Sequence, residues 1–209
     1  KNMHKAKINK NDEFYTQMSD IEKEVKHYRD QFKGKVVYCN CDDPAYFEGH
    51  EDVNNKGSNF WNYFYLNFEF LGLKKLISTH YDPEKPTYKL EYDGNEVVKT
   101  DLLENGDFRS NESIELLKES DIVCTNPPFS LFREYVAQLI EYEKDFLIMG
   151  NNNAITYKEI FPLIKENKIW LGYHANKTME FEIPSHYEKW SRIDENGTKY
   201  GKVPAISWF

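Results

Sequence analysis

The stretch "DIVCTNPPFSLFREYV", residues 121–136, places two prolines directly after a short apolar run. Proline fixes its own φ, removes a backbone donor and pushes the preceding residue toward extended geometry, so this pair cannot lie inside a sheet ladder or a helix interior. Residues 121–125 are therefore predicted to form a strand that ends at Asn126-Pro127-Pro128-Phe129, followed by a helix over residues 131–140. An ordinary strand-to-helix turn is the simplest interpretation of an isolated Pro-Pro pair, and the rest of the chain decides whether it suffices.

Strands and helices alternate along most of the chain. Ser19-Asp20-Ile21-Glu22 has the pattern of a capping box at the start of a first helix, and Ser58 is placed to cap a second. The predicted helices cover residues 21–32, 59–71, 114–119, 131–140 and 157–165, and the predicted strands cover 36–40, 76–79, 121–125, 145–149, 168–173 and 178–183. This alternation predicts an α/β fold, with a mostly parallel sheet and helices on both faces.

Three unusual loops follow predicted strands: "CDDP" at 41–44, "NPPF" at 126–129 and "GNNN" at 150–153. The carboxyl ends of parallel strands meet at one edge of a sheet, and ligands of α/β proteins bind there. This coincidence favours a binding or catalytic site over a set of unrelated turns.

Two hairpins are predicted outside the alternating pattern. Residues 88–98 contain the turn signal Asp93-Gly94, and residues 185–202 contain Asn196-Gly197. The second segment carries the basic residues Lys189, Arg192, Lys199 and Lys202. It fits a ribbon that enters the major groove of DNA, and it fits a solvated surface hairpin equally well. We expect a single domain over residues 1–209, with hairpin insertions near 87–100 and 185–202, and the apolar end Ala205–Phe209 suggests that part of the natural protein is missing.

The composition indicates a well-packed protein of 209 residues, 40% of them hydrophobic and 16% aromatic. The sequence contains no apolar run of about 18 residues, which predicts no membrane span, and the start of the chain lacks the apolar region of a secretory signal. Cys39, Cys41 and Cys124 fit reduced thiols in a cytoplasmic protein better than a zinc site. The net charge of −8 leaves nucleic-acid binding undecided, because such binding depends on local patches.

The residues Asn126–Phe129 suit the activation of an amine conjugated to an aromatic ring, as in adenine. The lone pair of such an amine is delocalised, and two acceptors aimed at its hydrogens draw it toward a nucleophilic geometry. The Asn126 side-chain oxygen is one acceptor, and the Pro127 carbonyl, held rigid by Pro128, is the other. Phe129 offers a ring on which the base can stack, and a base within duplex DNA must first be flipped out.

Six segments in chain order resemble the EcoRI-type DNA adenine methylases. They are "KNDEFYT", "YCNCDDP", "SNFWNYF", "LGLKKLISTHY", "GDF" and "TNPPFSLFREYV", so the likeness runs from about residue 10 to the end of the chain. The resemblance implies a Rossmann-like methyltransferase fold in which the single domain is catalytic. It also implies S-adenosyl-L-methionine as cofactor.

The resemblance assigns the site residues in four groups. Phe14, Tyr15 and Thr16 match the segment that closes over the methionine part of the cofactor, and Asp42, Asp43 and Pro44 match the loop after the first strand. Asp107 and Phe108 match the pair that holds the cofactor adenine. The catalytic motif is Asn126, Pro127, Pro128 and Phe129. Structural alternatives exist for the other groups too, besides the strand-to-helix turn already given for the last. Phe14 and Tyr15 also fit a hydrophobic staple of the first helix, Asp42 fits a strand-end cap, and Asp107 fits a turn residue.

The function expected from this resemblance is methyl transfer to the N6 amino group of adenine in a specific DNA sequence. The expected partner is double-stranded DNA with a flipped adenine, and the protein would belong to a restriction–modification system with a cognate endonuclease acting on the same site. The same chemistry on RNA adenine or on a glutamine side chain stays open. A nucleotide-binding regulator without turnover is the alternative from another class, although a pure binder has no need of the rigid acceptor pair.

Overall fold

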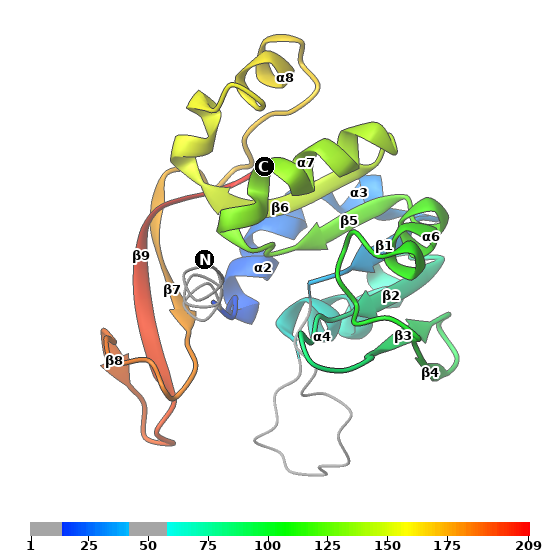
Figure 1. The fold of residues 1–209 in the computed structure, drawn as a ribbon, viewed down its shortest axis with the longest axis horizontal. Coiled ribbons are helices and arrows are strands. Elements are labelled where there is room, and N and C mark those ends of the chain that lie inside the picture. The colour runs from blue at the N-terminus through cyan, green and yellow to red at the C-terminus, as the bar shows by residue number, and fades with distance from the viewer. Residues whose placement is uncertain (1–13, 42–57) are drawn as a thin grey trace.

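The computed structural model describes residues 14–41 and 58–209 (Figure 1). These residues form a nine-stranded sheet of order β4-β3-β2-β1-β5-β6-β9-β7, with β8 paired to β9. The strands are β1 (Val36–Cys39), β2 (Lys75–Thr79), β3 (Tyr88–Tyr92), β4 (Val97–Asp101), β5 (Ile122–Thr125), β6 (Asp145–Asn151), β7 (Lys177–Glu182), β8 (Arg192–Ile193) and β9 (Lys199–Trp208). The four central strands, β2-β1-β5-β6, are parallel, and antiparallel strands extend both edges.

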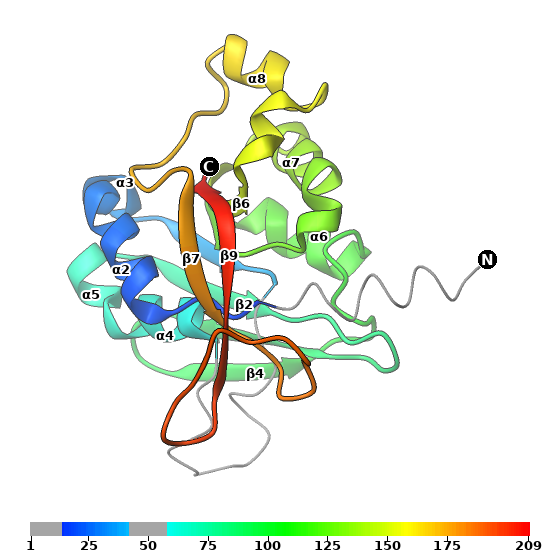
Figure 2. The same cartoon turned by 90° about the vertical axis from the view of Figure 1, so that its left-hand side faces the viewer.

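Helices cover both faces of this sheet, as predicted (Figure 2). One face carries α2 (Met18–Val25), η1 (Lys26–Tyr28), α3 (Arg29–Phe32), α4 (Asn59–Leu66) and α5 (Phe68–Leu71), and the other carries α6 (Asn111–Glu119) and α7 (Phe132–Glu141). The shorter elements η3 (Phe129–Leu131), η4 (Asn152–Thr156) and α8 (Phe161–Lys165) follow β5 and β6. The α/β fold class is thus confirmed, in a sheet that is mixed at its edges.

The central strands divide the core into two apolar clusters. All four residues of β1 are buried, because successive side chains of a strand point to opposite faces and both faces are covered. Val37 and Cys39 pack in the cluster with α2 and α4, whereas Val36 and Tyr38 pack in the cluster with α6 and α7. The uninterrupted apolar sequence of β1 is therefore explained by a strand that is covered on both faces.

Several local predictions are confirmed. Ser58 caps α4 by accepting a hydrogen bond from the Phe60 backbone N–H at 3.2 Å, and Gly72 ends α5 with a φ of 66°. The 88–101 hairpin turns at Asp93, whose Oδ1 accepts from the Asn95 backbone N–H at 2.9 Å. This hairpin pairs with β2 and so widens the sheet at that edge.

The predicted capping box of the first helix is wrong. The helix begins at Met18 with Gln17 at its N-cap, so Ser19 lies inside the first turn. The preceding residues are held extended, because Tyr15 forms an antiparallel bridge with Glu182 and Gln17 Nε2 donates to the Glu180 carbonyl at 2.8 Å. These long-range contacts fix the start of the helix.

The predicted strand over residues 168–173 is also wrong, since this segment has no regular structure. Its neighbour in space is Glu24, a fully buried carboxylate of α2. Glu24 accepts from the backbone N–H groups of Tyr173 at 2.7 Å and His174 at 3.0 Å, and from the Tyr28 hydroxyl at 2.8 Å. Within the predicted strand, the carboxylate thus takes the Tyr173 donor, and the Lys168 and Ile169 N–H groups donate to the Leu163 carbonyl, so these donors are not free for a sheet ladder.

Candidate active site

The NPPF motif leaves the carboxyl end of β5, and η3 begins at its Phe129. Asn126 Nδ2 donates to the Phe14 carbonyl at 2.8 Å. Asn126 Oδ1 is buried and has no hydrogen-bond partner among the described residues. A buried acceptor without a donor is unfavourable, so this oxygen is suited to a donor that a ligand supplies.

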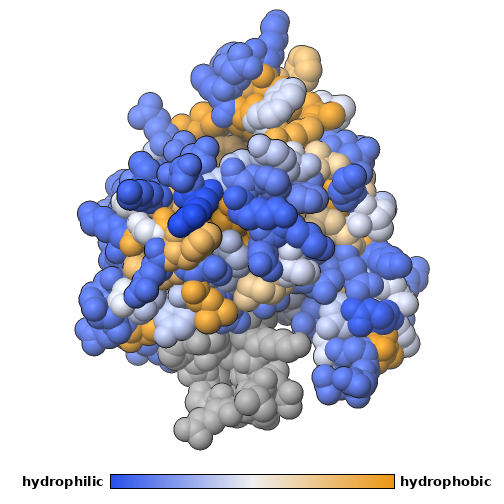
Figure 3. Space-filling view, turned by 180° about the vertical axis from the view of Figure 1, so that it is seen from behind, coloured by the Kyte–Doolittle hydropathy of each residue, from blue (hydrophilic) through white to orange (hydrophobic). Residues whose placement is uncertain are grey.

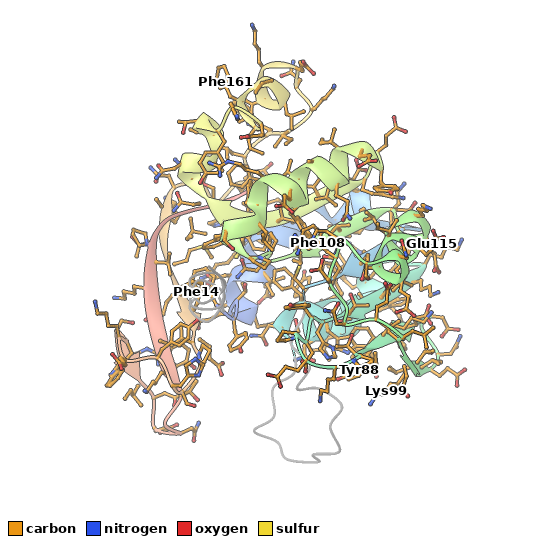
Figure 4. The ribbon with its side chains drawn as sticks, in the orientation of Figure 1. Phe14, Tyr88, Lys99, Phe108, Glu115 and Phe161 are labelled. Carbon is orange, nitrogen blue, oxygen red and sulfur yellow. The ribbon has the colours of Figure 1, made fainter. Side chains whose placement is uncertain are left out.

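Phe14 brings the start of the chain to the catalytic motif. Its ring stacks on that of Phe129, with centroids 6.1 Å apart, and also contacts Phe181 at 5.7 Å and Tyr187 at 6.5 Å. Figure 4 shows Phe14 beside β7. Because Gln17 is the N-cap of α2, Phe14 lies too far before it to act as the hydrophobic staple of that helix.

The next two residues lie across neighbouring elements. Tyr15 forms the bridge to Glu182 of β7. Thr16 is buried, and its hydroxyl donates to the sulfur of Met149 in β6 at 3.5 Å. The Thr16 carbonyl accepts from Asn59 Nδ2 of α4 at 2.8 Å. The predicted segment 14–16 is thus fixed beside the carboxyl ends of β5 and β6.

The GDF loop lies at the carboxyl end of β2. Gly106 has a φ of 75°, and a Cβ there would overlap the carbonyl oxygen of His80, the residue after β2. Phe108 is buried and its ring meets that of Tyr135 of α7 edge-on, with centroids 5.1 Å apart. Gln138 Nε2 of the same helix donates to the Phe108 carbonyl at 2.9 Å, so α7 anchors this loop (Figure 4).

Asp107 has a charged neighbour that was not predicted. Arg109 donates to both carboxylate oxygens of Asp107, at 2.9 and 2.7 Å, and reaches Glu134 at 3.0 Å. These hydrogen bonds hold the pKa of the Asp107 carboxyl below its usual value. Asp107 Oδ1 also accepts from the Arg109 backbone N–H at 2.8 Å. Asp107 therefore occupies a turn, which was the structural alternative for this residue. Its ionised carboxylate is also a hydrogen-bond acceptor.

Sequence reasoning missed a buried polar pair at the centre of the sheet. The Tyr135 hydroxyl donates to Oδ1 of Asn40, the residue that follows β1. Asn40 is 2% exposed and Tyr135 is fully buried. The available signal was an asparagine at the end of the apolar run "VVYC", although the spacing of Tyr135 fits an ordinary core residue.

Comparison with known proteins identifies the family. The family model described as "Adenine-specific methyltransferase EcoRI" matches residues 2–209. The chain belongs to this methyltransferase family. It is 51% identical to the type II methyltransferase M.EcoRI of Escherichia coli over 94% of this chain and 64% of that protein. It is 44% identical to the type II methyltransferase M.MpnI of Mycoplasma pneumoniae, over 99% of this chain and 63% of that protein.

The chain thus spans less than two thirds of the length of these curated relatives. No solved structure matches it. Of the residues that the resemblance assigns, Asp42, Asp43 and Pro44 lie outside the described residues. The other assigned residues lie in two groups, with Phe14–Thr16 beside the NPPF motif and Asp107-Phe108 packed on α7.

A groove of about 750 Å³ lies at the other end of the sheet. Its lining includes Ile122 and Asp145, the first residues of β5 and β6, together with Trp170 and Tyr173. Ligands of doubly wound sheets bind outside the carboxyl ends of the strands, so this groove is not the catalytic site of a methyltransferase. Figure 3 shows a largely hydrophilic back face, whose hydrophobic side chains gather mainly toward the α8 end.

Among residues 14–41 and 58–209, no helix has the length and apolar character needed to cross a membrane. The same residues contain no group of three or more His, Cys, Asp or Glu side chains placed to hold a metal ion.

Proposed function

We propose that the protein transfers a methyl group from S-adenosyl-L-methionine to the N6 amino group of adenine in a specific double-stranded DNA sequence. It would act in the cytoplasm as the methylating component of a restriction–modification system, with a cognate endonuclease that cuts the same site. The observation that carries the proposal is the buried Asn126 Oδ1, an acceptor without a protein donor, in a member of an adenine-specific methyltransferase family.

The proposed mechanism begins with the orientation of the Asn126 amide. Since Nδ2 donates to the Phe14 carbonyl, Oδ1 faces away from Phe14 and can accept one hydrogen of the flipped adenine N6. The Pro127 carbonyl accepts the other. The two acceptors localise the nitrogen lone pair and stabilise the positive charge that develops on N6 during attack. Phe129 supports the plane of the base, and the ring of Phe14 buttresses Phe129.

The methyl group would come from the sulfonium sulfur of bound S-adenosylmethionine, with S-adenosylhomocysteine as the leaving group and one N6 proton released to solvent. The residues present fit this cofactor. The ionised Asp107 carboxylate can accept from the adenine amino group of the cofactor through Oδ2, which has a lone-pair site beyond its bond to Arg109, whereas Oδ1 already accepts twice from Arg109. Phe108 would pack against the adenine ring. Phe14, Tyr15 and Thr16 would enclose the methionine part, together with Asp42, Asp43 and Pro44.

Side-by-side assays of labelled-methyl transfer to duplex DNA, RNA and protein test the proposal. We expect label in duplex DNA that contains adenine, recovered as N6-methyladenine. Duplex DNA of guanine and cytosine alone is the matched control and should stay unlabelled. Label in RNA or in a glutamine side chain, with none in duplex DNA, would show that DNA is not the substrate. Binding of S-adenosylhomocysteine without transfer to any acceptor would favour the nucleotide-binding regulator.

The hairpin over residues 185–202 is proposed to contact the DNA backbone. β8 and β9 pair here, and the Phe14–Tyr187 contact places the hairpin beside the catalytic motif. Arg192 pairs with Glu180 at 2.6 Å, and Lys199 Nζ donates to the Ser185 carbonyl at 2.6 Å. Lys199 therefore holds the hairpin together, and Arg192 ties it to β7. The other two, Lys189 and Lys202, are exposed and remain for phosphates.

Replacing Lys189 and Lys202 together by Ala should weaken DNA binding and flatten the plot of log K against log salt concentration. Each lost phosphate contact should lower the slope by about 0.9, because fewer counterions are released. Titrations of DNA binding at several salt concentrations measure this change. The matched control replaces Lys33 and Lys165, exposed lysines of other elements. If both pairs change the slope equally, the hairpin is not the DNA contact.

A further inference from the structure

Asn40 occupies the point in the sheet where the chain order reverses. β1 lies between β2 and β5, so the chain proceeds from β1 to one side and later returns to the other. Crevices for ligands open outside the carboxyl ends of strands at such points. Asn40 follows the last residue of β1 and is 2% exposed. A buried amide in this position needs partners for its oxygen and for its nitrogen.

The protein satisfies the oxygen of this amide. The Tyr135 hydroxyl donates to Asn40 Oδ1, and the Cys41 thiol approaches the same oxygen at 3.7 Å. Burial raises the pKa of Tyr135 well above its usual value, so its phenol is a hydrogen-bond donor at neutral pH. The donor fixes the amide with Oδ1 toward α7. The Nδ2 protons then point away from Tyr135, and none of the hydrogen bonds found among the described residues uses them.

Tyr135 also connects this amide to the cofactor loop and to the catalytic motif. Its ring packs edge-on against Phe108 with centroids 5.1 Å apart. Its helix, α7, begins directly after η3, which starts at Phe129. One side chain thus contacts the loop after β1 and the loop that carries Asp107.

We propose that Tyr135 is a positioning residue, which orients the Asn40 amide so that Nδ2 donates to an oxygen acceptor of the bound cofactor. S-adenosylmethionine has two such acceptors, its ribose hydroxyls and its carboxylate. This inference rests on the proposed function, because it names a contact of the same cofactor site. Asn40 is the residue that touches the cofactor, and Tyr135 acts through it.

Calorimetry with two ligands tests the inference and separates the two acceptors. S-adenosylhomocysteine carries both the ribose and the carboxylate, and 5′-methylthioadenosine carries the ribose alone. Tyr135→Phe removes one oxygen atom and should weaken S-adenosylhomocysteine binding by about 5-fold to 10-fold, the range of one neutral hydrogen bond. An equal loss for methylthioadenosine assigns the ribose, and no loss for that ligand assigns the carboxylate.

Tyr38→Phe is the matched control. Tyr38 is also fully buried, and its hydroxyl lies 2.9 Å from the Thr79 hydroxyl, while none of the hydrogen bonds found among the described residues joins it to Asn40. Both variants lose one buried hydroxyl, so a general loosening of the fold would lower their melting temperatures and affinities alike. In steady-state assays Tyr135→Phe should raise KM for S-adenosylmethionine and leave kcat nearly unchanged. Equal affinities for Tyr135→Phe and the unmodified protein would overturn the inference.

The pairing with Asn40 gives a second criterion. Asn40→Ala should weaken S-adenosylhomocysteine binding by about 10-fold, and adding Tyr135→Phe to it should have no further effect, because Tyr135 acts through the amide. Additive losses would show that Tyr135 contributes by another route. If the unmodified protein binds no S-adenosylhomocysteine, the proposed function itself fails. If the unmodified protein binds S-adenosylhomocysteine and both Asn40→Ala and Tyr135→Phe bind it as tightly as the unmodified protein does, only the present inference fails.

Discussion

Asn126→Ala is expected to lower the rate of methyl transfer by about 10²-fold or more, on the scale measured for loss of one preorganised hydrogen-bonding group of an active site. The substitution removes the buried oxygen that accepts from the target amine. Cofactor affinity should change little, because Asp107 and Phe108 are anchored through α7. Single-turnover transfer to duplex DNA measures the rate, and calorimetry with S-adenosylhomocysteine measures the affinity.

Asn95→Ala is a suitable control for this experiment. Asn95 is an exposed asparagine in the turn between β3 and β4, at the edge of the sheet and outside the candidate site. Its substitution should leave the transfer rate within about twofold, since substitutions of surface residues away from a site have small effects. Near-normal turnover of Asn126→Ala would exclude Asn126 from the mechanism. A large loss of cofactor affinity in the same variant would instead trace its effect to the lost bond with the Phe14 carbonyl.

Gly106→Ala is expected to displace the GDF loop. A Cβ at Gly106 would overlap the His80 carbonyl oxygen and lie 2.7 Å from Thr87 Oγ1. Backbone must move, and the residues that move with it are Asp107 and Phe108. The free energy of unfolding should fall by about 3 kcal/mol, the sum of a left-handed backbone penalty and an overpacked contact. Cofactor affinity should fall about 10-fold or more, since loss of a hydrogen bond to a charged group is of this size.

Gly34→Ala separates the two contributions. Gly34 has a φ of 74°, close to the 75° of Gly106, and a Cβ there would meet no atom within 4 Å. Denaturation of Gly34→Ala should show only the backbone penalty of about 1 kcal/mol, with unchanged binding of S-adenosylhomocysteine. Equal stability of the two variants would mean that the contact with His80 relaxes freely, and that the GDF loop is not held by it.

The sequence predicts the central strands well because their physical signal is local. The apolar run of β1 and the paired prolines after β5 each exclude other structures without reference to the rest of the chain. The start of the first helix was predicted less well than that of α4, which Ser58 caps as predicted. Ser19 has the right residue type for a cap, but the bridge between Tyr15 and Glu182 decides where the helix begins. Residues 168–173 have the composition of a strand, but Lys168 and Ile169 donate to the Leu163 carbonyl and Tyr173 donates to the distant Glu24.

The same difference separates the predicted and the missed parts of the candidate site. Asn126 and Asp107 belong to short motifs that stand contiguous in the sequence. The Asn40–Tyr135 hydrogen bond joins residues 95 positions apart, and the Asn126–Phe14 bond joins residues 112 positions apart. A single sequence contains no local signal for such pairs. Arg109 is near Asp107 in sequence, yet nothing in its residue type indicates whether it turns back or faces solvent.

The position of β9 between β6 and β7 has a consequence for the order of folding. Residues 199–208 leave the ribosome after every other strand of the sheet, so β6 keeps an open edge until that moment. The hydrogen bond from the Thr16 hydroxyl to the Met149 sulfur likewise cannot form until residue 149, 133 positions later, has been synthesised. Contacts between distant positions form slowly, since the loop between them must first close. Tyr15 in turn pairs with Glu182 of β7, and β7 pairs with β9. The segment 14–16 therefore acquires its last partner only when synthesis of the sheet has ended.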